Sequence, residues 1–249
     1  GQENPLWHGI ARTMHYVPDG DGFLLKNGHR KFNRALYGSN TAFRVEAGDL
    51  PEFALYMPGM GGNFKLGLVQ GNNSKWITEA TTITAKYHAG AMLYTIEDPL
   101  LGSGKLFIEI LAMADVEGFI VKARMQNVIA PVELFCAFGG ASGKKFSRDG
   151  DMGPDPESSF YLQPENCRDN SYTVEKSNFT LKYGTGLEVG KEGRYFVEDL
   201  KQESKPVKEQ VLVGTFPSQS TLKIGDASQL TSPQNFYDSN VVKAPALAG

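Results

Sequence analysis

An all-β fold, with two large antiparallel sheets stacked face to face and little helix, is predicted from three observations. Short stretches of alternating apolar and polar residues recur along the chain. Turn signals such as Asp19–Gly22, Asn27–Gly28 and Pro58–Gly59 separate them at intervals of roughly 10 residues. The 249 residues include 28 Gly and 13 Pro, which suits many short strands joined by tight turns. About 15 strands are expected, too many for one small sandwich.

Alternation is clearest at residues 119–126, where Phe119, Val121, Ala123 and Met125 share one face and polar residues occupy the other. This pattern predicts a half-buried strand. Further strands are expected at residues 11–17, 22–26, 41–47, 52–57, 64–70, 76–87, 91–97, 131–138, 158–163, 171–176, 178–183, 210–215 and 220–224.

Residues 105–113 are apolar on both faces, which predicts a central strand between two layers. This strand carries one carboxylate, Glu109. A buried carboxylate must be paired or neutral, and Arg34 or Arg44 is the expected partner.

The chain is expected to form one domain over residues 1–227, because no sharp break in composition divides it. Residues 194–203 give the one hint of a helix. Residues 228–249 turn polar and then lose alternation, so they are predicted to be a polar tail or linker.

Composition excludes some functions. The net charge of −3 is small and mixed, which argues against nucleic-acid binding, since phosphate neutralisation needs a clustered basic surface. No apolar run is long enough for a transmembrane helix. The two cysteines are Cys136, in an apolar strand, and Cys167, in a polar loop. Their spacing does not decide whether they form a disulfide.

No catalytic motif is evident. Gly-x-Ser-x-Gly is absent, and the four histidines have no metal-ligand spacing. The isolated chain is therefore not expected to be catalytic or to need a cofactor. One loop, with Asp149, Asp151 and Asp155, resembles the start of a calcium-binding pattern but lacks the distal Glu. The alternative is a polar Asx-type loop.

Residues 31–67 mix aromatic and charged side chains, as carbohydrate sites do. The candidate carbohydrate-binding residues are Arg34, Tyr37, Arg44, Glu46 and Glu52. The alternative is structural. Since apolar and charged residues alternate through 43–47, the charges could pair across strands where the chain turns a corner of the sandwich.

Three stretches, residues 33–56, 98–104 and 148–151, resemble an uncharacterised family of secreted, glycosidase-like proteins from polysaccharide-degrading gut-type bacteria. The resemblance implies a galactose-mutarotase-like supersandwich that precedes a helical, glycosidase-like region. It also implies a secreted or periplasmic protein whose signal peptide has been removed, which suits a first residue, Gly1, that is not Met. No catalytic residue is carried over, because the family's β-rich region has none established.

Three functions are therefore considered. The first is a non-catalytic β-sandwich domain that packs on the helical catalytic domain of the same protein and contributes to carbohydrate binding. The second is a free-standing carbohydrate-binding or mutarotase-like protein, for which His88 with Glu97 or Glu109 is the candidate acid–base set. The third is a structural or assembly module without a ligand, whose exposed apolar strips contact a partner.

Overall fold

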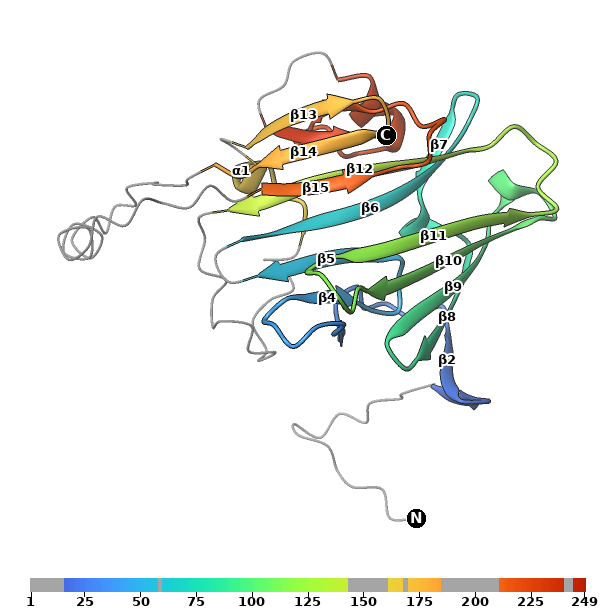
Figure 1. Ribbon diagram of the computed structural model, residues 1–249. Coiled ribbons are helices and arrows are strands. Elements are labelled where there is room, and N and C mark those ends of the chain that lie inside the picture. The colour runs from blue at the N-terminus through green and yellow to red at the C-terminus, as the bar shows by residue number, and fades with distance from the viewer. Residues whose placement is uncertain (1–15, 58–59, 143–160, 168–169, 185–210, 240–243) are drawn as a thin grey trace, which may run out of the picture.

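The protein folds into antiparallel β-sheets arranged in two layers (Figure 1). The computed structural model describes residues 16–57, 60–142, 161–167, 170–184, 211–239 and 244–249. The predicted all-β sandwich is confirmed. A third, smaller sheet lies beside one of the two large sheets.

The first large sheet has six strands in the order β1-β2-β8-β9-β10-β11. Its strands are β1 (Val17–Asp19), β2 (Gly22–Lys26), β8 (Thr82–His88), β9 (Ala91–Glu97), β10 (Lys105–Ala112) and β11 (Phe119–Gln126). β11 is an edge strand, paired only with β10 among the described residues.

The second large sheet has eight strands. Seven follow the order β16-β17-β12-β6-β5-β4-β3, and β7 pairs with the second half of β6. The strands are β3 (Arg34–Leu36), β4 (Arg44–Ala47), β5 (Glu52–Met57), β6 (Met60–Gln70), β7 (Asn73–Trp76), β12 (Glu133–Ser142), β16 (Lys223–Asp226) and β17 (Pro245–Ala248).

The small sheet has the order β13-β14-β15, with β13 (Ser171–Glu175), β14 (Asn178–Lys182) and β15 (Val211–Thr215). Its edge strand is β15. Helical structure in the described ranges is short: α1 (Pro164–Cys167), α3 (Pro233–Tyr237), and the 3₁₀ turns η1 (Ile77–Glu79) and η2 (Pro99–Leu101).

The six-stranded and three-stranded sheets pack on the same face of the eight-stranded sheet. Phe64 of β6 lies directly opposite Phe138 of β12 in the sheet register, so both rings project from one face. The Phe64 ring meets Phe119 of β11 at 6.1 Å between centroids, and the Phe138 ring meets Phe179 of β14 at 5.9 Å. One layer is thus a continuous sheet, and the other consists of two sheets side by side.

The predicted alternation of residues 119–126 is confirmed by the register. Val121 and Ala123 lie opposite Ile110 and Ile108, which are buried in the main core. β10 differs from its prediction, because only one of its faces is fully buried.

Glu109 lies on the less buried face of β10. Its carboxylate is 3.6 Å from Lys122 Nζ, and 35% of the Glu109 side chain is exposed. The expected pairing of Glu109 with Arg34 or Arg44 is therefore wrong. The cause is that the outer face of this sheet is open to solvent, so no buried partner is required.

Residues 228–249 differ from the expected linker. They contain α3 and β17, and β17 lies between β16 and β12 in the eight-stranded sheet. Its residues show no alternation because both faces of the strand are buried: Leu247 joins the main core, while Ala246 and Ala248 pack in a second cluster with Phe236 of α3.

Three other segments differ from, or lie outside, the predictions. The strand expected at 76–87 is interrupted by η1, because the chain crosses there from the eight-stranded to the six-stranded sheet. Residues 161–163 are not in a strand. The helix expected at 194–203 lies outside the described residues.

Candidate functional site

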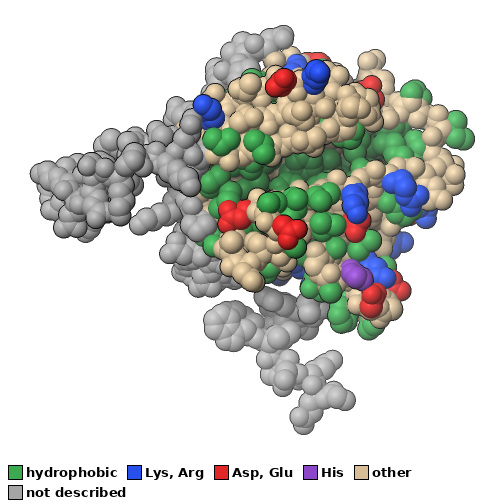
Figure 2. All heavy atoms as spheres, in the orientation of Figure 1, with side chains coloured by type: hydrophobic (Ala, Val, Ile, Leu, Met, Phe, Trp, Pro, Cys, Tyr) green, Lys and Arg blue, Asp and Glu red, His purple; other side chains and the backbone are tan. Residues whose placement is uncertain are grey.

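An apolar groove runs between the two sheets that share one layer. Its walls are the edge strands β11 and β15, and its floor is formed by β6 and β12. Figure 2 shows hydrophobic side chains gathered in this hollow. The groove has a volume of about 1250 Å³. That exceeds the roughly 300–1,000 Å³ of ordinary small-molecule pockets, so its size suits a larger occupant.

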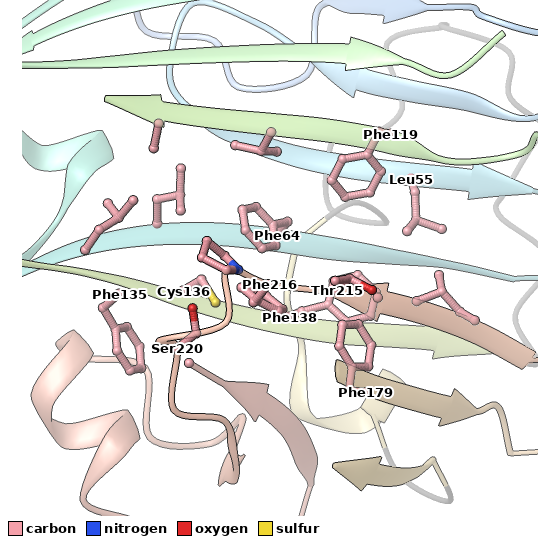
Figure 3. A pocket seen from close by; sticks show the side chains of 18 of the residues that line it. Leu55, Phe64, Phe119, Phe135, Cys136, Phe138, Phe179, Thr215, Phe216 and Ser220 are labelled. Carbon is pink, nitrogen blue, oxygen red and sulfur yellow. The ribbon is translucent and has the colours of Figure 1, made fainter. Parts of the chain in front are cut away.

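Phenylalanine rings form much of the apolar lining of the groove (Figure 3). Each floor ring supports one wall, since Phe64 contacts Phe119 of the β11 wall and Phe138 contacts Phe179 below the β15 wall. The Phe216 ring, just after β15, lies 6.2 Å from that of Phe179. The two walls therefore pack on different rings of the floor.

Polar groups are few in the groove and lie toward its margins. Among the described residues that line it, the charged ones are Glu117, in the turn before β11, and Glu133, at the start of β12. Polar side chains of Thr215, Gln219 and Ser220 border the β15 side. The groove therefore has a mainly apolar lining with polar side chains along its margins.

Cys136 lies on the groove floor, and Cys167 packs near the opposite face of the sheet; both thiols are free and buried. Burial in apolar surroundings raises the pKa of each thiol to about 12. Neither cysteine is therefore a nucleophile near neutral pH, because the thiolate is the reactive form.

The predicted carbohydrate-binding residues lie elsewhere, on β3 to β5 and beside them. Arg44 and Glu46 form a buried ion pair on β4, and the Arg44 guanidinium stacks 4.0 Å from the centre of the Tyr56 ring. Glu52 is fully buried, with Lys31 Nζ at 2.9 Å and Lys65 Nζ at 3.0 Å. These three charged residues are held by protein partners.

Arg34 and Tyr37 are not part of that arrangement. The Arg34 guanidinium lies between two tyrosine rings, 4.6 Å from the centre of Tyr16 and 4.8 Å from that of Tyr87. Tyr37 is 60% exposed. The five residues thus do not form one open surface; only Tyr37 presents an aromatic face to solvent.

The mutarotase-like set is not brought together either. His88 Nε2 lies 2.6 Å from Asp21 Oδ2 at an exposed position. His88 and Glu97 lie at opposite ends of the β8–β9 hairpin, since their cross-strand partners are Ala91 and Thr82. Glu109 lies opposite Leu93, away from both ends.

Asp149, Asp151 and Asp155 lie outside the described residues. Within the described ranges, no three His, Cys, Asp or Glu side chains converge as metal ligands. None of the helices in those ranges has the length and apolar content needed to span a bilayer.

Sequence reasoning missed the groove. The apolar alternation of residues 119–126 and 210–215 was visible, but it does not reveal that both strands end up at sheet edges facing each other. Edge position depends on pairing between distant segments, so it is not encoded in a local pattern.

Fold and groove together define an all-β sandwich with a large apolar groove. Residues 57–249 match the family described as a domain of unknown function, DUF4450, and the chain belongs to that family. No curated protein and no solved structure matches the chain. The matched range holds nearly all of the groove, whereas the five predicted carbohydrate-binding residues precede it.

Proposed function

We propose that the chain is a non-catalytic β-sandwich module that packs on another protein domain through the groove between β11 and β15. One observation supports this above all: an apolar groove of about 1250 Å³ lies between β11 and β15 above Phe64 and Phe138, and the side chains of Val116 and Val213 that line it are exposed. Exposed apolar side chains that cluster around a groove are typical of interaction sites. Most of the groove also lies within the family-matched residues.

The partner that suits the sequence resemblance is a helical, glycosidase-like catalytic domain of the same protein, secreted or periplasmic. In this arrangement the β-sandwich supplies rigidity and one wall of the assembly, and the chemistry belongs to the partner. The separation of His88, Glu97 and Glu109 along the sheet favours the same division of roles.

The test is co-expression. The full chain is produced together with any helical region that its native gene encodes beside it, as a separate polypeptide. We expect the two to co-purify, and we expect Val116→Lys, at a groove-lining position that is 52% exposed, to separate them. The matched control is Ile129→Lys, at a 95% exposed position that does not line the groove. A native gene without such a region, or two polypeptides that do not associate, overturns the proposal.

Direct carbohydrate binding is a second candidate, favoured by the exposed ring of Tyr37. Aromatic faces bind the CH groups of sugars, and Tyr37 is the one candidate residue with an exposed ring. Calorimetry with plant and host glycans tests this role: binding that is lost in Tyr37→Ala, with the melting temperature unchanged, supports it. No heat with any glycan rejects it.

A further inference from the structure

The two walls of the groove are unpaired strand edges. β11 ends the six-stranded sheet and β15 ends the three-stranded sheet, so each presents a row of backbone N–H and C=O groups with no strand partner among the described residues. Such edges are templates for pairing with another chain. Here two of them face one hollow.

The directions of the two strands restrict what fits between them. In Figure 1, β11 and β15 point the same way. One strand that runs antiparallel to both would therefore pair with each in the favoured antiparallel pattern and join the two sheets into one.

The edge of β15 lacks the usual protection against pairing. Natural edges carry charged residues, Pro or bulges, but Val211–Thr215 contains no charged residue and no Pro. Val213 is 74% exposed and Val211 is 47% exposed. β11 carries Lys122 and Arg124, yet it also exposes Ile120. Apolar side chains at these positions are the cross-strand neighbours that an added strand would cover.

The groove also specifies the side chains of its occupant. In an added strand, every second residue would point down onto the floor formed by Phe64 and Phe138, and the others would point to solvent. Glu117 lines the groove at the starting end of β11. Its carboxylate favours a basic residue at this end of the occupant.

We propose that the groove binds one extended polypeptide strand, antiparallel to both β11 and β15, with an apolar residue at every second position and a basic residue at the end that lies beside Glu117. The length follows from the walls, since β15 has 5 residues and β11 has 8. This inference rests on the proposed docking function and names the element of the partner that enters the groove.

The probe is a synthetic peptide of about nine residues, with alternating Val and Thr and a Lys at its C-terminal end, which lies beside Glu117 when the peptide is antiparallel to β11. It is added to the full chain, and backbone hydrogen exchange is followed at β11 and β15. We expect exchange to slow at least tenfold in both strands. Two control peptides carry N-methyl groups, one on the odd and one on the even residues. Each lacks the N–H groups for one edge, so each should bind at least tenfold more weakly.

A protein variant sharpens the test. Val213→Lys places a charge on the unprotected edge at an exposed position and should weaken binding of the peptide at least tenfold, whereas Ile129→Lys should leave it unchanged. The melting temperatures of both variants show that the fold is retained.

Other outcomes overturn the inference. N-methylated peptides that bind equally well, or a peptide that protects one strand alone, exclude strand addition. A dimer of the chain that shields both edges without peptide assigns the groove to a second copy. If no peptide binds but the helical region co-purifies, the strand mode fails and the docking function stands. If the peptide binds as expected and no helical region associates, the proposed domain partner is the part that fails.

Discussion

The two faces of β5 and β6 differ in character: one is charged and the other is apolar. One face carries Glu52, Lys65 and Asn63, with the ionised groups paired. The other carries Phe64 and Leu55, which contribute to the groove. The charged face looked like a binding site in the sequence, but its charges are satisfied within the protein. The apolar face looked like ordinary core, and its residues are buried, but they also line the groove. The candidate site is therefore marked by its apolar groove and not by an unusual local composition.

The largest expected effect is on the charged face. Glu52→Ala leaves Lys31 and Lys65 near each other without their common carboxylate. Because breaking a buried pair strands uncompensated charge, the free energy of unfolding should fall by about 3–5 kcal/mol in urea titrations.

The control for Glu52 is Glu109→Ala, which breaks the exposed pair with Lys122. Its cost should stay below about 1 kcal/mol, since solvent screens exposed ion pairs. Equal losses in the two variants would mean that the charged face does not stabilise the fold and would reopen its role as a binding site.

A smaller effect is expected at Asp98, which links the two large sheets. The buried Asp98 carboxylate accepts hydrogen bonds from Lys75 Nζ at 2.8 Å and from the Thr81 and Leu100 amides at 3.1 Å. Burial raises the pKa of Asp98, but the bonds to Lys75, Leu100 and Thr81 outweigh it and hold that pKa below its ordinary value of 3.8.

A depressed pKa in the folded state means that the stabilisation is present above pH 3.8 and is lost as the pH falls through the folded pKa. Asp98→Asn should therefore cost about 1.5–3 kcal/mol at pH 7. The difference between the two proteins should shrink in urea titrations below pH 3.8. A difference that is constant from pH 7 to pH 3 would contradict the linkage.

The smallest effect on stability belongs to the groove. Val213→Lys and Val116→Lys alter exposed groove positions and should change the free energy of unfolding by less than about 0.5 kcal/mol. Both should nevertheless weaken partner association. A groove variant that unfolds the protein would show that the hollow is part of the stabilising core.

Local patterns predicted much of the fold. The bounds of β2, β5, β9 and β11 coincide with the expected strands, because each has clear alternation or clear flanking turns. β3 and β17 were not predicted. β3 has only three residues, and β17 is Pro-Ala-Leu-Ala, in which small residues replace the usual β-branched ones. These strands form because neighbours pair with them, not because of their own propensity.

The candidate site was harder to predict, because whether a side chain is available to a ligand depends on the residues that surround it in the fold. Arg44, Glu46 and Glu52 have the chemistry of a sugar site, yet their partners come from nearby strands and loops that close over them. Conversely, the sequence pattern around Phe64 and Phe138 indicates ordinary core residues. They are buried, and their place beneath the groove depends on the edges of two separate sheets, which no single segment encodes.

The position of β17 also has a consequence for folding order. Residues 245–248 pair on one side with β16 and on the other with β12, whose contacting residues Ala137 and Phe138 are more than a hundred positions earlier. During synthesis, β12 can dock on β6 long before β17 emerges from the ribosome, so its other edge remains open in the interval. The nascent chain therefore passes through a stage with an extra unprotected edge, at which a chaperone would have the most to shield.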